Sequence, residues 1–62
     1  LTVAEVRQVQ SLLAAKGYDI GKVDGIIGAS TRQAVKTEQQ KFGLPADSYP
    51  SRELLQKLSG GA

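Results

Sequence analysis

The chain has 62 residues, enough for one domain with a small hydrophobic core and too few for a deep active-site cavity. It contains no cysteine and no histidine, which excludes disulfides, thiol nucleophiles, histidine bases and the commonest zinc ligands. Only carboxylate or hydroxyl chemistry remains, and we expect no metal and no cofactor. The net charge is +2 and the eight Lys and Arg residues are scattered, which argues against nucleic acid as a partner.

The two ends of the chain and its apolar segments carry a few further expectations. No apolar stretch reaches the roughly 20 residues of a membrane span, so we expect no membrane insertion. The chain begins at Leu1 rather than at a methionine, so we expect it to be part of a longer or processed protein. Residues 59–62 have no apolar periodicity and are predicted to form a flexible tail.

A first helix is predicted to start near Val3, because Thr2 and Glu5 have the spacing of a capping box. Apolar residues then recur at positions 6, 9 and 13, which is helical spacing. Gly17 suits the left-handed position that ends such a helix, and Tyr18 follows where its ring can pack back on the last turn.

The segment after this helix holds four of the chain's seven glycines and is predicted to be a loop of defined path. Asp24 and Gly25 together are a turn signal, since aspartate can hydrogen-bond its own downstream backbone and glycine accepts a positive φ. The Asp24 carboxylate could also contact a ligand amine. The spacing of acidic residues does not fit an EF-hand, and the glycines do not fit a phosphate-binding loop.

Two more helices are predicted downstream. Ser30 and Gln33 have capping-box spacing at the start of the second helix, and Gly43 is predicted to end it. Pro50 suits the first turn of a third helix, whose apolar face contains Leu54, Leu55 and Leu58.

A degenerate repeat relates the two halves of the chain. Shifting the sequence by 29 positions aligns residues 6–10 with residues 35–39, and each is followed by a glycine stop and an Asp-led turn. Two copies are too few for a solenoid. We therefore predict an all-α fold over residues 1–58, a compact three-helix bundle built from a helix-loop repeat.

Four further side chains are candidates for ligand contact. Arg32 and Lys36 lie four residues apart near the start of the second helix, where backbone N–H groups and the helix dipole favour a carboxylate. A solvated basic face is the alternative interpretation of this pair. Tyr18 and Tyr49 adjoin turns, where an amphipathic ring can be a platform for a sugar or peptide or can be packed half-buried.

Glu38 stands where the repeat and the helical periodicity predict an apolar residue. Because an isolated buried carboxylate is costly, we expect it at the edge of the core, paired with Lys41 or another cation. Glycosidase chemistry needs two carboxylates across a cleft, and the sequence offers no such pair.

In chain order, these motifs resemble the peptidoglycan-binding domain family, an accessory module of bacterial cell-wall hydrolases. The motifs are Val9-Gln10-x-x-Leu13, Gly17-Tyr18, Asp24-Gly25-x-x-Gly28-x-x-Thr31, Ala34-Val35, Gln39, Gly43-Leu44, Leu54-Leu55 and Leu58. Residues 44–51 look most like the C-terminal module of membrane-bound lytic transglycosylases of the B type. The chain departs from the family at Glu38, where an aromatic residue is usual, and at Ser48, where glycine is usual.

The resemblance implies a three-helix fold without catalytic activity that binds peptidoglycan, through either its glycan strand or its stem peptide. It also implies that the module holds a catalytic domain of the same chain on its substrate, outside the cytoplasm, in the periplasm or cell wall. We expect a monomer with an affinity no better than about micromolar. The expected ligand-binding residues are Tyr18, Asp24, Gly25, Gly28, Thr31, Arg32, Lys36 and Tyr49.

Two other functions fit parts of the sequence. The chain could be a protein-interaction or autoinhibitory module that packs on its own catalytic domain, which an exposed apolar patch would favour. A small helix-turn-helix DNA-binding domain is the other alternative. It is disfavoured because the second helix offers only Arg32 and Lys36 to contact DNA before Glu38.

Overall fold

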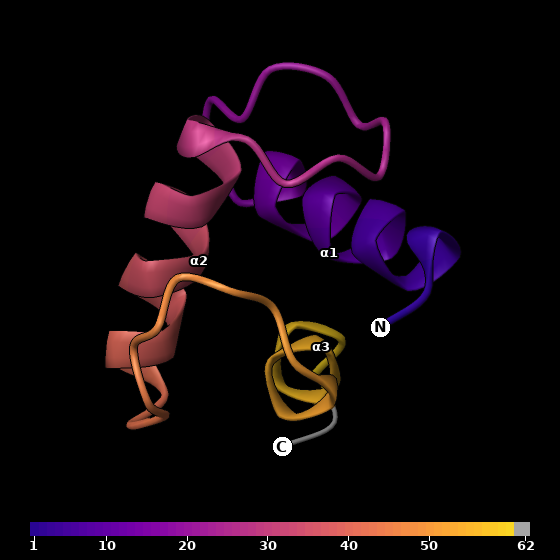
Figure 1. Ribbon diagram of the computed structural model, residues 1–62. Helices are drawn as coiled ribbons and strands as arrows, with labels where there is room; N and C mark the ends of the chain where they lie inside the picture. The colour runs from indigo at the N-terminus through magenta and orange to yellow at the C-terminus, as the bar shows by residue number, and fades with distance from the viewer. Residues whose placement is uncertain (61–62) are drawn as a thin grey trace.

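The computed structural model describes residues 1–60, which form three helices joined by two long loops (Figure 1). The helices are α1 (Val3–Ala15), α2 (Ala29–Lys41) and α3 (Arg52–Leu58). Helix α1 contacts both of the others, the α1–α2 loop arches over α1, and the α2–α3 loop runs back along α2 before crossing to α3 (Figure 1). The predicted all-α three-helix fold is confirmed.

Both ends of α1 follow the sequence prediction. The Thr2 hydroxyl accepts a hydrogen bond from the Glu5 backbone N–H at 3.2 Å, and Glu5 Oε1 accepts one from the Thr2 N–H at 2.9 Å. At the other end Gly17 has a φ of 98°, and the Tyr18 N–H donates to the Leu13 carbonyl at 3.2 Å. The capping box and the glycine stop are therefore both confirmed.

The start of α2 differs from the prediction. Gly28 is the N-cap, Ala29 is the first helical residue, and no side chain caps the helix, so Ser30 lies inside the first turn. Glycine is only a few tenths of a kcal/mol worse than serine as an N-cap, so tertiary contacts can decide between them. The deciding contact here is the buried Thr31 hydroxyl, which accepts a hydrogen bond from Gln10 Nε2 at 3.3 Å.

The C-terminal end of α2 agrees with the sequence prediction, and the start of α3 does not. Gly43, with a φ of 71°, ends α2 as predicted. Helix α3 begins later than predicted, because Ser51 is its N-cap and accepts a hydrogen bond from the Leu54 N–H at 3.2 Å. Pro50 therefore precedes the helix and does not lie in its first turn, since the Ser51 hydroxyl supplies the better cap.

The core lies between the three helices and takes one residue, Ile20, from the α1–α2 loop. Its buried side chains are Val9, Leu13, Ile20, Ala34, Val35, Leu54 and Leu58. No helix within residues 1–60 is long and apolar enough to cross a membrane. Ser59 and Gly60 donate backbone hydrogen bonds back to α3, and residues 61–62 of the predicted flexible tail lie outside the described residues.

The first loop is held in place by Gln10, a buried side chain of α1. Its Oε1 accepts a hydrogen bond from the Gly25 N–H at 2.8 Å, and its Nε2 donates to the Ile26 carbonyl at 2.9 Å. The turn closes when the Ile26 N–H donates to Asp24 Oδ1 at 2.9 Å. One buried side-chain amide thus pairs with a backbone N–H, that of Gly25, and with a backbone carbonyl, that of Ile26.

The second loop repeats this arrangement around Gln39, which lies 29 positions after Gln10. Gln39 Oε1 accepts from the Ser48 N–H at 3.1 Å, and Nε2 donates to the Tyr49 carbonyl at 2.9 Å. Asp47 Oδ1 accepts from the Tyr49 N–H at 3.0 Å. Ser48 has a φ of 71°, which explains why glycine is the usual family residue at this position.

Candidate functional site

The outward face of α2 carries two shallow hollows that meet along the helix. The first, of about 460 Å³, lies against Tyr18 and Asp19 of the α1–α2 loop. The second, of about 560 Å³, lies against residues 47–49 of the α2–α3 loop. Because Ser30, Gln33 and Lys36 line both, the hollows form one continuous surface.

We call this surface the α2 strip. Its residues are Tyr18, Asp19, Ala29, Ser30, Arg32, Gln33, Ala34, Lys36, Thr37, Gln40, Asp47, Ser48 and Tyr49. The strip is shallow and polar, and each of its two edges is supplied by an anchored loop. The first loop is anchored by its own buried residue Ile20, and the second by the buried Gln39 side chain of α2. Such a surface suits weak binding of an extended ligand and does not enclose a small substrate.

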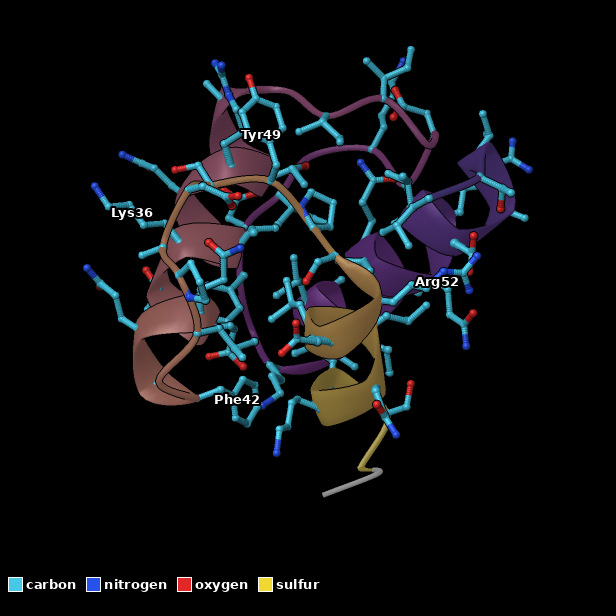
Figure 2. All side chains as sticks on the ribbon, turned by 60° about the horizontal axis from the view of Figure 1, so that its bottom comes forward. Lys36, Phe42, Tyr49 and Arg52 are labelled. Carbon is cyan, nitrogen blue, oxygen red and sulfur yellow. The ribbon has the colours of Figure 1, made fainter. Side chains whose placement is uncertain are left out.

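Arg32 and Lys36 give the strip its positive charge, and both side chains are exposed. The first turn of α2 contains no acidic residue to neutralise them. Figure 2 shows Lys36 projecting away from α2 into solvent, while Tyr49 lies beside the first turns of the same helix. The arrangement can attract a carboxylate to the region between the two side chains.

Two carboxylates border the cationic region. Asp19 lines the first hollow and is exposed. Asp47 lines the second, where hydrogen bonds from the Tyr49 N–H and the Gln39 side chain hold its pKa below the usual range. Asp47 is therefore ionised at neutral pH and is engaged in shaping its turn.

The two tyrosines of the strip differ in their availability to a ligand. Tyr49 is 54% exposed and is held through its backbone, so its ring is free to contact a ligand. Tyr18 is half-buried, its hydroxyl donates to Glu38 Oε2 at 2.7 Å, and Lys41 Nζ lies 5.8 Å from its ring centre. Tyr18 therefore borders the first hollow chiefly as a structural side chain.

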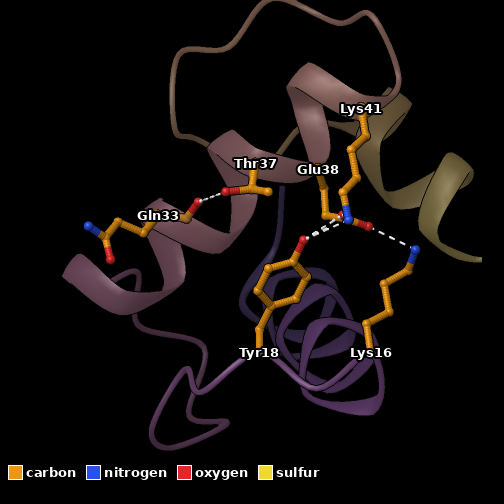
Figure 3. A network of polar contacts seen from close by, with 6 residues as sticks. All are labelled: Lys16, Tyr18, Gln33, Thr37, Glu38 and Lys41. Carbon is orange, nitrogen blue, oxygen red and sulfur yellow. Dashed lines mark hydrogen bonds and ion pairs between the residues drawn. The ribbon is translucent and has the colours of Figure 1, made fainter.

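Glu38 forms a polar network beneath this end of the strip (Figure 3). Its side chain is fully buried, with Oε1 2.8 Å from Lys16 Nζ and Oε2 3.3 Å from Lys41 Nζ. The predicted pairing with Lys41 is confirmed, but the expected position at the edge of the core is wrong. Full burial is possible because Lys16 supplies a second cation and the Tyr18 hydroxyl donates a hydrogen bond to the carboxylate. Oε1 has the Lys16 ion pair but no hydrogen bond of regular geometry within residues 1–60.

The network also determines the charge state of Glu38. Burial raises the pKa of this carboxyl, but the contacts with Lys16, Tyr18 and Lys41 together outweigh burial and hold the pKa below its usual range. The Tyr18 hydroxyl and the Glu38 carboxylate in turn raise the pKa of Lys41. Glu38 is thus a buried anion at neutral pH, and its role is structural.

The structure places four of the predicted ligand-binding residues outside the strip. Asp24 and Gly25 form the Gln10-held turn over the start of α1, Gly28 caps α2, and Thr31 is buried. All four shape the loop that precedes the strip. The remaining four predicted residues, Tyr18, Arg32, Lys36 and Tyr49, are brought together on the strip.

Several residues of the strip were missed from the sequence. Ser30, Gln33, Thr37 and Gln40 recur at helical spacing on the face of α2 opposite its apolar stripe, which is the signal that could have identified them. Asp19 carried no local signal, because it meets α2 only through the path of the loop. Within residues 1–60, no three His, Cys, Asp or Glu side chains gather as a metal site would require.

The match to a known family agrees with this geometry. A family model described as "Putative peptidoglycan binding domain" matches residues 2–58, and the chain belongs to this peptidoglycan-binding domain family. It is a peptidoglycan-binding module of the type that occurs in cell-wall lytic enzymes.

Individual relatives share the module within longer proteins. The chain is 41% identical over 54 residues to the spore cortex-lytic enzyme of Bacillus cereus, a match covering 87% of this chain and 21% of the enzyme. It is 45% identical over 56 residues to the "Putative OxPP cycle protein OpcA" of Synechocystis sp., covering 90% of this chain and 12% of that protein.

A solved structure has the same fold. SltB3 from Pseudomonas aeruginosa, in complex with NAG-anhNAM-pentapeptide, superposes with a TM-score of 0.85 and 51% identity. This match covers 95% of the present chain and 16% of SltB3. The chain thus spans 12–21% of the length of these relatives.

Proposed function

We propose that the α2 strip is the peptidoglycan-binding surface of this module and that the module holds an attached cell-wall hydrolase on its substrate. The strip carries this proposal, because exposed Arg32, Lys36 and Tyr49 side chains converge there on two adjoining hollows. Peptidoglycan offers carboxylates, amines and N-acetyl groups that such a surface can contact. The module itself contributes binding and no catalytic group.

Two of the relatives, the spore cortex-lytic enzyme and SltB3, support an attached enzyme that degrades peptidoglycan. We propose a lytic transglycosylase as this enzyme, on the basis of the 51% identity to SltB3 and of residues 44–51, which resemble the B-type enzymes. The site of action is then extracytoplasmic, in the periplasm or cell wall. The module acts as a monomer within that longer chain.

The shape of the strip bears on its affinity. Shallow hollows leave much of a ligand hydrated, so we expect a dissociation constant no tighter than about micromolar. Tethering raises the local concentration of the module near its polymer to the millimolar range. Weak contacts that exchange quickly are compatible with an enzyme that moves along its substrate.

Co-sedimentation with purified sacculi tests the proposed surface. The parent chain is expected to pellet with sacculi, and Tyr49→Ala should pellet less, because it removes an exposed ring next to Arg32 and Lys36. The matched control is Ile26→Ala, which removes the equivalent, 70% exposed side chain of the other Gln-held turn. Absence of parent binding, or equal losses in both variants, would contradict the proposal.

One observation favours packing on a catalytic domain as a second candidate function. Val3 and Ile26 are 63% and 70% exposed, and they flank the Gly25 turn at the start of α1, away from the strip. A full-length enzyme carrying Val3→Ser and Ile26→Ser would then lose contact between its domains and show a changed activity on soluble substrate. Unchanged activity on soluble substrate would exclude this candidate.

A further inference from the structure

We infer that the α2 strip binds the stem peptide of peptidoglycan in preference to its glycan strand, with peptide carboxylates at Arg32 and Lys36 and a free peptide amine at Asp19. This inference rests on the proposed function of the strip. It is carried by the aromatic content, the order of charges and the dimensions of the surface.

The supply of aromatic rings is too small for a glycan-stacking surface. The chain contains two tyrosines and one phenylalanine. Phe42 lies outside the strip, beneath Lys16 Nζ at 5.6 Å, and Tyr18 is engaged with Glu38 and Lys41. Tyr49 alone offers an exposed face, so successive sugar rings of a glycan would find a single platform.

Charges are distributed across the strip in a definite order. Asp19 lines only the first hollow, Arg32 lines only the second, and Lys36 lines both. The other carboxylate of the second hollow, Asp47, already accepts hydrogen bonds from Gln39 and the Tyr49 N–H. A stem peptide that contains a diamino acid carries carboxylates and one free side-chain amine at separate points along its length. The glycan strand presents hydroxyl and N-acetyl groups, which leave Asp19, Arg32 and Lys36 without counter-charges.

Polar side chains between the charges suit a peptide backbone. Gln33 and Gln40 lie on the exposed face of α2, and their amides make no hydrogen bond to residues 1–60. Each amide can donate to one peptide carbonyl and accept from one peptide N–H. Thr37 is less available, because its hydroxyl donates to the Gln33 carbonyl at 3.0 Å (Figure 3).

The dimensions allow one stem to reach both hollows. A helix with its side chains is about 10–12 Å across, and five extended residues span at most about 17 Å. A pentapeptide lying across α2 can therefore place a carboxylate at Lys36 while its amine reaches Asp19. A ligand confined to one hollow would leave Arg32 or Asp19 unused.

The first half of the internal repeat provides a position for a control substitution. The positions of α1 that are equivalent to Arg32 and Lys36 are Val3 and Arg7. There the turn packs so closely on α1 that a Cβ placed on Gly25 would be 2.6 Å from Val3 Cγ1. Arg7→Ala therefore removes a similarly placed cation from a half of the fold that lacks the strip.

Soluble peptidoglycan fragments with and without stem peptides test the inference. In NMR titrations the parent chain is expected to bind glycan fragments that keep their stems, and to bind stem-free glycan strands, released from sacculi by an amidase, severalfold more weakly. Equal affinity for the two kinds of fragment would overturn the stem-peptide inference and leave the proposed function standing. Failure to bind either fragment or intact sacculi would overturn the proposed function and the inference with it.

A second experiment assigns the charged contacts. In NMR titrations with a stem pentapeptide containing meso-diaminopimelate, Lys36→Ala should raise the dissociation constant roughly two- to fivefold, the range of an exposed ion pair, and Arg7→Ala should leave it unchanged. The N-terminus of the pentapeptide is blocked throughout, so that the diaminopimelate amine is its one free amine. Asp19→Asn should weaken binding of this peptide and not of the form in which the diaminopimelate amine is acetylated as well. Equal effects of Lys36→Ala and Arg7→Ala, or of Asp19→Asn on both peptides, would overturn the assignment.

Discussion

At position 25, in the α1–α2 loop, the backbone combines a left-handed conformation with a close approach to α1. Gly25 has a φ of 79°, and a Cβ there would lie 2.6 Å from Val3 Cγ1 and 3.2 Å from the Val3 carbonyl oxygen. The valine side chain is stiff at χ1 and the carbonyl belongs to the backbone, so neither atom can move aside cheaply. Glycine at position 25 is therefore required both by the turn and by the packing of the loop on Val3.

Replacement of this glycine separates the two effects. Gly25→Ala should destabilise the chain by about 2–4 kcal/mol, of which about 1–2 kcal/mol comes from the left-handed backbone and the rest from overpacking. Gly21→Ala is the control, since Gly21 has a φ of 75° and no atom within 4 Å of the added Cβ. Urea denaturation measures both, and equal losses would show that the contact with Val3 is unimportant.

Each helix-loop unit of the fold is organised by one buried glutamine. Gln10 joins α1 to the first turn and Gln39 joins α2 to the second, with the same pairing of side-chain amide and backbone groups. The repeat seen in the sequence is therefore a repeat of turn anchoring. The units have diverged at the residue that each turn exposes, which is Ile26 in the first and Tyr49 in the second.

Removing either glutamine should release its own loop. Gln10→Ala and Gln39→Ala each leave backbone groups without partners, at an expected cost of about 2–4 kcal/mol in unfolding free energy. Hydrogen exchange should show lost protection at Gly25 after the first substitution and at Ser48 after the second. Each variant is the control for the other, and loss of protection in both loops from one substitution would contradict independent anchoring.

For the molecule as a whole, the Glu38 network ties the end of α1 and the first loop to α2. The carboxylate is ionised in the folded state with a lowered pKa, so its stabilising effect is complete above the unfolded-state pKa of about 4.3. That stabilisation is lost as the pH falls through the folded-state pKa. Glu5 and Asp47 have lowered pKa values as well and add to the acid sensitivity.

A substitution at Glu38 should flatten this pH dependence. Glu38→Leu is expected to cost no more than about 1 kcal/mol of stability at pH 7. Removing one partner of a buried ion pair is costly when the other charge stays buried, but the Lys16 and Lys41 side chains are 44% and 64% exposed and their ammonium groups can hydrate. Thermal unfolding from pH 7 to pH 3 should then show a smaller loss than in the parent chain. Glu53→Gln, outside the network, is the control, and parallel profiles for Glu38→Leu and the parent would contradict the prediction.

Local signals predicted most of the fold. The capping box at Thr2, the glycine stops at Gly17 and Gly43 and the apolar stripes depend on residues only a few positions apart. The predicted N-cap of α2 was wrong because glycine and serine differ little in energy as N-caps, and α3 begins after Pro50 because the Ser51 side chain caps it. Only half of the predicted site residues lie on the strip. The others were chosen because residues that shape a turn and exposed residues that contact a ligand have the same pattern in a sequence.

By itself, the sequence determined the helices, their order and the family, since these follow from hydrogen bonds and periodicities within short segments and from motif order. The tertiary structure decided which face of α2 meets both loops and that Lys16 joins Lys41 on Glu38. It also decided that two glutamines hold the turns. These contacts join residues up to 22 positions apart, and the packing of the helices alone brings them together.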